Sequence, residues 1–158
     1  MEVLEGAAWF ERLVDDLGSA SSVTLASYTY DEPAIQAIME RRLRSRACEV
    51  EVMVDKEAHD AATTRFQRSR LAALRDLGAR VRLCQGKPRS RIYGKNARGH
   101  GLFHKKVVVI DKRVLYHGSA NCSRNSRCNE ESVLRLTGPP VMCVLSGLEE
   151  ARQASYTL

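Results

Sequence analysis

Apolar residues in the first half of the chain recur either at helical spacing or in short β-branched and alternating runs. The helical spacing predicts helices over residues 7–17, 33–46 and 57–77. The β-branched and alternating runs predict strands over residues 22–30, 49–54 and 80–84. Helices and strands therefore alternate up to residue 84, which is typical of a layered α/β domain.

Glycine and proline interrupt this alternation between residues 86 and 101, which predicts a loop. The elements expected beyond it are a strand at 103–110, a tight turn at 111–113, a returning strand at 114–116, a polar loop at 121–129, a strand at 133–136 and a helix at 141–154. This order predicts one α/β domain over residues 1–158, in which helices flank a mixed β-sheet.

The charge of the chain narrows the class of partner. The 158 residues carry a formal net charge of +6, and the isoelectric point is near 9.3. Such an excess favours polyanions, namely nucleic acid or anionic lipid, although a basic protein without such a partner has the same composition. No run of about eighteen apolar residues suits a membrane span, and no secretory signal is visible at the amino terminus.

The five cysteines are an odd number without a C-x2-C pair, which supports neither a full disulfide set nor a zinc site. Cys48, Cys84 and Cys143 stand among apolar residues, and we expect them to be buried. Cys122 and Cys128 flank a basic stretch, where free thiols are favoured over a local disulfide. This usage favours a reducing, intracellular compartment.

The candidate chemistry is concentrated between residues 104 and 121. His104, Lys106 and Asp111 are followed by Gly118-Ser119 and Asn121, which is the pattern H-x-K-x4-D-x6-G-S-x-N. Alternation along the expected strand places His104 and Lys106 on one face. An imidazole beside fixed positive donors suits attack on a phosphodiester.

This pattern resembles the phospholipase D superfamily, whose H-x-K-x4-D signature is followed by G-S-x-N and a later glutamate. Glu131 matches that glutamate, and Glu130 is the rival position. The resemblance extends to the small single-motif nucleases of bacterial type and to the Zucchini-type mitochondrial nucleases. Neither the amino-terminal membrane segment nor the cysteine/histidine zinc module of the latter occurs in these 158 residues. A mitochondrial surface location stays open if an amino-terminal anchor has been removed.

The resemblance implies a role for each motif residue. His104 is the nucleophile that forms a phosphohistidine, and Lys106 and Asn121 bind the non-bridging phosphate oxygens. Ser119 donates to the phosphate or to the His104 ring, and Glu131 accepts a hydrogen from the second ring nitrogen. For Asp111, which ends the strand at a turn, a structural role is favoured over a chemical one.

One motif copy supplies half of the site that the superfamily builds from two. The resemblance therefore implies a homodimer in which two copies of the chain share one active site. No second H-x-K exists in the chain, and no cluster of ligands at metal-binding spacing is visible. We expect neither a metal nor a cofactor.

Two basic stretches bracket the motif in sequence. The first supplies Lys87, Arg89, Arg91, Lys95 and Arg98 without an acidic residue, and the second supplies Arg124 and Arg127. Both are expected to contact phosphates beyond the scissile one, with a solvated surface as the alternative.

These features favour a metal-independent phosphodiesterase, most simply an endonuclease acting on single-stranded DNA or RNA. Hydrolysis of a phospholipid, phosphatidylcholine or cardiolipin, is the first alternative, because the basic loops also suit an anionic headgroup. A catalytically inactive nucleic-acid-binding scaffold is the second, although such a domain has no need of the complete motif.

Overall fold

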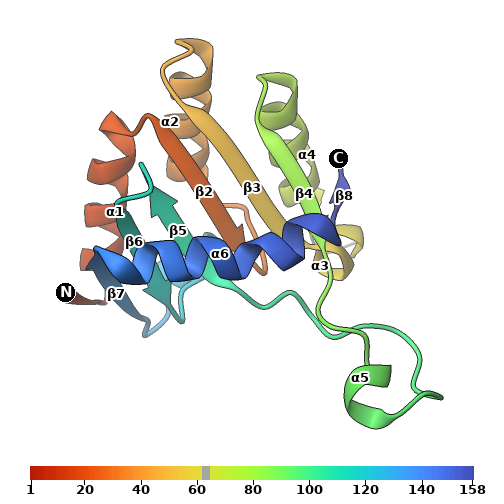
Figure 1. Ribbon diagram of the computed structural model, residues 1–158. Coiled ribbons are helices and arrows are strands. Elements are labelled where there is room, and N and C mark those ends of the chain that lie inside the picture. Colours follow the sequence, from red (N-terminus) through yellow and green to blue (C-terminus); the bar gives the residue numbers. More distant parts are fainter. Residues whose placement is uncertain (62–64) are drawn as a thin grey trace.

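The computed structural model describes residues 1–61 and 65–158 and contains one eight-stranded sheet with helices on both faces (Figure 1). The strands are β1 Glu2–Glu5, β2 Ser22–Ser27, β3 Glu49–Asp55, β4 Arg80–Cys84, β5 Lys106–Ile110, β6 Val114–Gly118, β7 Ser132–Thr137 and β8 Tyr156–Thr157. The helices are α1 Ala8–Ser19, α2 Pro33–Arg44, α3 Lys56–Asp60, α4 Arg65–Asp76, α5 Ser90–Tyr93 and α6 Pro139–Gln153, with a 3-10 turn at Asn125–Arg127.

The strand order is β1-β7-β6-β5-β2-β3-β4-β8, and the sheet is mixed. Strands β2, β3 and β4 run parallel, whereas β5 runs antiparallel to β2. Because β5 runs antiparallel to β2, the first residue of β5 lies beside the last residue of β2, at one end of these two strands. The predicted α/β class with a mixed sheet flanked by helices is confirmed.

The two faces of the sheet have separate apolar cores. Helices α1, α2 and α4 cover one face, where alternate residues of β3 such as Val52 are buried with Leu13 and Leu71. Helix α6 crosses the other face, where Met53 and Leu148 are buried (Figure 1). Since successive residues of a strand point to opposite faces, one strand supplies both cores.

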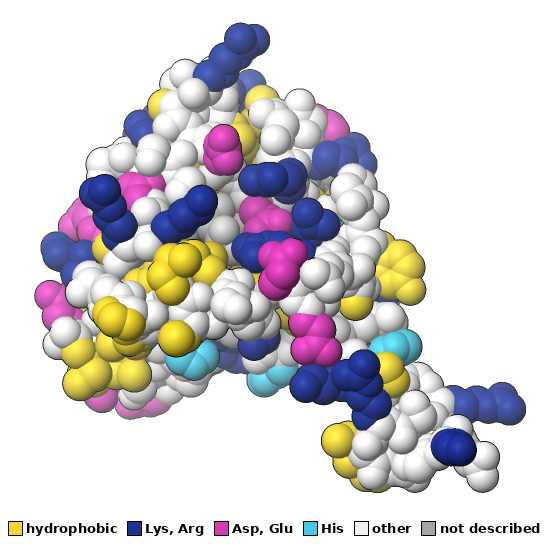
Figure 2. Space-filling model, viewed as in Figure 1, with side chains coloured by type: hydrophobic (Ala, Val, Ile, Leu, Met, Phe, Trp, Pro, Cys, Tyr) yellow, Lys and Arg dark blue, Asp and Glu magenta, His cyan; other side chains and the backbone are white. Residues whose placement is uncertain are grey.

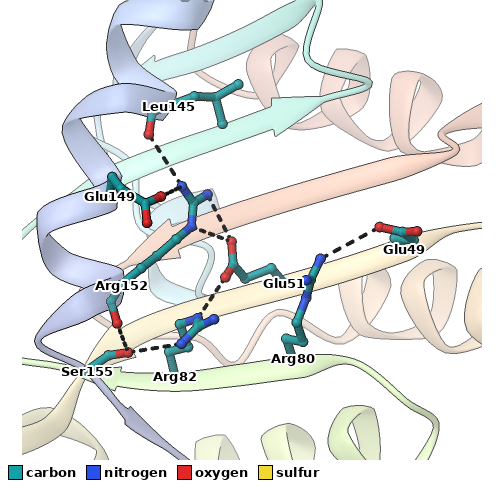
Figure 3. Close-up of polar contacts among 8 residues, drawn as sticks. All are labelled: Glu49, Glu51, Arg80, Arg82, Leu145, Glu149, Arg152 and Ser155. Atoms are coloured by element: carbon teal, nitrogen blue, oxygen red, sulfur yellow. Dashed lines mark hydrogen bonds and ion pairs between the residues drawn. The ribbon is translucent and has the colours of Figure 1, made fainter.

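An ion-pair network fastens α6 to the sheet (Figure 3). Glu51 of β3 accepts hydrogen bonds from Arg82 of β4 at 2.8 Å and from Arg152 of α6 at 2.9 Å. Burial alone would raise the pKa of the Glu51 carboxyl, but the hydrogen bonds from the two guanidinium groups outweigh it and lower that pKa. The network thus ties the carboxyl-terminal helix to strands β3 and β4.

Several predicted boundaries were wrong. The helix expected over 57–77 is two helices, because Ala61 is extended with ψ at 140° after α3. Positions 62–64 of that expected helix lie outside the described residues. The strand expected over 22–30 ends at Ser27, whose hydroxyl donates to the carbonyl of Thr29 at 2.7 Å in a turn.

Other elements carried no sequence signal. Strands β1 and β8 are short and lie at the two edges of the sheet, and α5 interrupts the expected loop over 86–101. All five cysteines are free, but Cys143 is exposed and Cys48 is half-buried, against the expectation of burial. A local apolar sequence does not decide whether a position on a helix faces the core.

Candidate active site

All of the motif residues except Asp111 lie around the end of the sheet where β2 ends and β5 begins. Lys106 is the first residue of β5, and His104 lies just before the strand rather than within it. The expectation that strand alternation aligns the two side chains was therefore wrong for His104. The two side chains nevertheless meet: Lys106 Nζ lies 3.1 Å from His104 Nδ1 and 3.2 Å from Nε2. The ammonium thus rests against the ring that is expected to attack.

Two residues that the sequence did not indicate contact His104 or its neighbour Phe103. The ring centroid of Tyr28, which follows β2, is 5.0 Å from that of His104, with the planes tilted by 54°. Asp55, at the end of β3, accepts a hydrogen bond from the backbone N–H of Phe103 at 2.6 Å. Only the pairing of β2 with β5 and with β3 brings these residues to His104, so no local sequence signal could have found them.

Glu131 lies just before β7 and is held by neighbouring side chains. The Ser119 hydroxyl donates to Glu131 Oε2, and Asn129 Nδ2 donates to Glu131 Oε1 at 3.2 Å. Among the described residues, these hydrogen bonds take the place of the expected one from His104. Burial lowers the pKa of the Lys106 ammonium, and the nearby carboxylate of Glu131 opposes this shift. Glu131 therefore acts electrostatically on Lys106.

Gly118 permits the close approach of β6 and β7. Ser119 directly follows β6, and Glu131 directly precedes β7. A Cβ atom at this position would lie 2.1 Å from the carbonyl oxygen of Ser132, which is far inside contact distance. The backbone N–H of Ser132 also donates to Ser119 Oγ at 3.1 Å. The Gly-Ser pair of the motif is thus needed to seat Glu131 beside the site.

Asn121 is positioned by the serines on either side of it. Its backbone N–H donates to Ser126 Oγ at 2.9 Å, and its Oδ1 lies 3.4 Å from Ser27 Oγ. Ser27 Oγ also accepts from the N–H of Cys122 at 3.1 Å. Burial raises the pKa of the Cys122 thiol to about 12, so that neighbour of Asn121 stays protonated.

Residues 122–128, here named the docked loop, are fixed against the start of α2. The carbonyl of Cys122 accepts from the backbone N–H of Asp31 at 3.1 Å, and the Asp31 carboxylate accepts from the N–H of Arg124 at 2.8 Å. The Arg127 guanidinium lies 3.6 Å from the buried carboxylate of Glu32 and 4.4 Å from the Phe10 ring centroid. The Arg127 side chain is therefore directed to Glu32 rather than left free for phosphate.

Asp111 lies at the opposite end of β5 from Lys106. Its Oδ1 accepts from the backbone N–H groups of Ser21 and Ser22 at 2.8 and 2.7 Å and from the Ser21 hydroxyl at 2.8 Å. Burial would raise the pKa of the Asp111 carboxyl, but these hydrogen bonds outweigh it and lower that pKa. Asp111 thus fastens the turn after β5, away from His104.

The cations of the first basic stretch, residues 87–98, differ from one another. Arg91 lies 3.4 Å from Glu150 of α6, and Arg89 Nε donates to the carbonyl of His100 at 3.2 Å. Within the described part of the chain, no hydrogen bond or ion pair engages the side chains of Lys87, Lys95 and Arg98.

Residues 1–61 and 65–158, which the structure describes, contain no group of three or more His, Cys, Asp or Glu side chains arranged to hold a metal ion. None of the helices described there has the length and apolar character needed to cross a bilayer.

Comparison with known proteins identifies the family and confirms the fold. The family described as "Cardiolipin synthase, PLD-like domain" matches residues 13–147. Curated proteins give no match. NucT from Helicobacter pylori superposes with a TM-score of 0.82 at 20% identity, covering 99% of this chain and 98% of that one. Nuc from Salmonella typhimurium, a phospholipase D family member, gives 0.79 at 16%, covering 99% and 97%.

A third solved structure shares the fold over part of its length. The archaeal chromatin protein TrmBL2, described with a novel mode of DNA binding, gives a TM-score of 0.67 at 12% identity. The match covers 99% of this chain but 54% of TrmBL2. At such identities these likenesses establish the fold alone.

Proposed function

The chain belongs to the phospholipase D-like family, and we propose that it is a metal-independent phosphodiesterase that cleaves nucleic acid as an endonuclease. The observation that carries this proposal is the contact of Lys106 Nζ with the His104 ring at 3.1 and 3.2 Å. A nucleophile and a cation that can bind the attacked group then share one edge of the sheet with Asn121.

The proposed reaction has two steps, each of which balances within the site. A ring nitrogen of His104 attacks phosphorus, the bond from phosphorus to the leaving oxygen breaks, and that oxygen takes up a proton. Water then attacks the phosphohistidine, gives its proton to a base and frees the ring. Lys106 and Asn121 stabilise the charge on the non-bridging oxygens in both steps, which requires no metal ion.

The proton for the leaving oxygen has to come from the side opposite the attacking ring. A single His104 cannot both attack and protonate across phosphorus at the same time. We propose that two chains related by a two-fold axis share one site, so that a second copy of His104 supplies this proton. Only one of the two rings then holds the phosphoryl group at a time.

Nucleic acid is favoured over lipid by the distribution of charge. Within residues 1–61 and 65–158, no hydrogen bond or ion pair engages the side chains of Lys87, Lys95 and Arg98, which stand in a stretch without acids. The net charge of +6 also suits a polyanion. A lipid substrate is the second candidate, because the family that matches is described as that of a lipid enzyme. An inactive scaffold would have no use for the contact of Lys106 with His104.

The test is a direct comparison of substrates with EDTA present. Single-stranded DNA, RNA, duplex DNA, and vesicles of phosphatidylcholine and cardiolipin are incubated with the full chain, with His104→Ala as the blank. We expect cleavage of nucleic acid that is lost in Lys106→Ala and kept in the matched control Lys112→Ala, at the far end of β5. Hydrolysis of lipid alone, or dependence on a divalent ion, would contradict the proposal.

A further inference from the structure

Residues 86–101, here named the arm, form a projection that leaves the sheet after β4 and returns before β5 (Figure 1). Backbone hydrogen bonds close its base: the N–H of Gly86 donates to Gly101 at 2.8 Å, and that of Gly101 donates to Lys87 at 3.0 Å. A Cβ at Gly86 would lie 2.5 Å from the carbonyl carbon of Gly101. The arm is therefore a hairpin loop whose base is closed by backbone hydrogen bonds and by the close packing of Gly86 against Gly101.

The tip of the arm exposes large apolar side chains among cations. Ile92 and Tyr93, in α5, are 72% and 75% exposed. Figure 2 shows dark-blue and yellow side chains together on the lobe that projects beyond α6. Since water hydrates an exposed ring and an exposed isoleucine poorly, this combination suits a partner that offers both flat apolar faces and negative charge.

Two hollows lead from the tip of the arm to the nucleophile. One, of about 590 Å³, lies between the base of the arm and α6 and is lined by His104. The other, of about 720 Å³, lies on the arm and is lined by Tyr93 and Arg98. Both are lined by Lys87 and Leu102, so they are adjacent. A strand that lies across them can reach His104 with one phosphate while its neighbours follow the arm.

Single-stranded nucleic acid is the partner that matches this surface. Proteins that hold single strands combine a cationic groove with aromatic rings on which unpaired bases stack. A duplex keeps its bases within the helix, and a lipid headgroup has no flat base. We infer that the arm is a binding surface for a single strand, on which Tyr93 stacks against an unpaired base and Lys95 and Arg98 contact phosphates.

This inference rests on the proposed function for the choice of nucleic acid, and binding tests it without cleavage. In the His104→Ala background, anisotropy of labelled 12-nucleotide strands compares oligothymidylate, an abasic strand and a duplex. Tyr93→Ala should weaken binding of oligothymidylate about tenfold and leave the abasic strand and duplex nearly unchanged. Tyr93→Phe, which keeps the ring, is the matched control. Arg98→Gln should weaken binding of oligothymidylate and abasic strand alike.

Three outcomes would overturn the inference. If Tyr93→Ala weakens binding of the abasic strand equally, Tyr93 only supports the fold of the arm. If it weakens binding of no strand, the arm faces away from the nucleic acid. A shift from dimer to monomer in sedimentation of Tyr93→Ala would make the arm a subunit contact. Hydrolysis of bis(4-nitrophenyl) phosphate by the His104-containing chain reports on the proposed activity separately, so that a failure of the proposed activity is distinguishable from a failure of this inference.

Discussion

The arm and the docked loop are both basic in sequence, yet the structure uses their cations differently. In the docked loop, acids from the start of α2 engage the chain: Asp31 accepts from the N–H of Arg124, and Glu32 lies beside Arg127. In the arm, Arg91 meets Glu150, but Lys95 and Arg98 project without a described partner. A run of cations thus stays available to a polyanion only where the fold brings no acid within ion-pair distance.

This difference assigns separate tasks to the two regions. The docked loop places Asn121, which is expected to act on the reacting phosphate. The backbone N–H of Asn121 donates to Ser126 Oγ, and that of Cys122 donates to Ser27 Oγ. The arm is joined to the body through its base and is expected to act on the rest of the substrate. Changes at Asn121 should therefore affect chemistry, and changes in the arm should affect binding.

Among changes that distinguish the two regions, the largest effect is expected at Asn121. Asn121→Ala should lower kcat about 10²–10³-fold with little change in KM, because it removes one donor to the developing charge. Steady-state cleavage of a labelled oligonucleotide measures both constants. Asn125→Ala, in the docked loop that follows Asn121, is the matched control. A change confined to KM would place Asn121 in substrate binding and remove the distinction between the two regions.

The next effect is expected in the arm. Replacing Lys87, Lys95 and Arg98 by Gln should lower the slope of log K against log salt by about 0.7 for each lost phosphate contact. Titration of the His104→Ala chain with a single strand at several salt concentrations measures the slope. Arg113→Gln, in the turn after β5, should leave it unchanged. An unchanged slope in the triple variant would show that the free cations of the arm do not face the substrate.

A smaller effect concerns stability, and it distinguishes the ion pair beside the docked loop from the ion pair of the arm. Glu32→Gln should lower the free energy of unfolding by about 1–2 kcal/mol, below the usual cost of breaking a buried pair because Arg127 is 51% exposed. Glu150→Gln breaks the exposed pair with Arg91 and should cost less than about 0.5 kcal/mol. Urea unfolding measures both. Equal losses would mean that the two regions are anchored alike.

The smallest effect concerns pH. Burial lowers the pKa of the Lys106 ammonium and Glu131 opposes this, so activity that needs the protonated amine should fall as pH rises through that lowered pKa. Glu131→Gln removes the opposing carboxylate and should move the alkaline limb of kcat to lower pH. Arg98→Gln, in the arm, should leave the limb in place. A shift to higher pH in Glu131→Gln would exclude this coupling.

Much of the fold could be read from local patterns. The alternation of helices and strands up to β4 and the hairpin of β5 and β6 agree with the spacing of apolar residues, because burial of one face imposes that spacing. Strands β1 and β8 could not be predicted, since an edge strand of two to four residues has too few positions to show a period. The break between α3 and α4 could not be predicted either, because the apolar residues of α4 dominate the helical pattern of this region.

The sequence by itself determined the family, the α/β class and the identity of the candidate residues, because a motif is a property of residue order. Only the tertiary structure decided that His104 stands outside β5, that Tyr28 lies beside its ring, and that Arg127 is taken up by Glu32. The physical reason is distance along the chain: Arg127 and Glu32 lie on segments far apart in the sequence and meet only when the sheet forms. Which charges stay free is set by such long-range contacts.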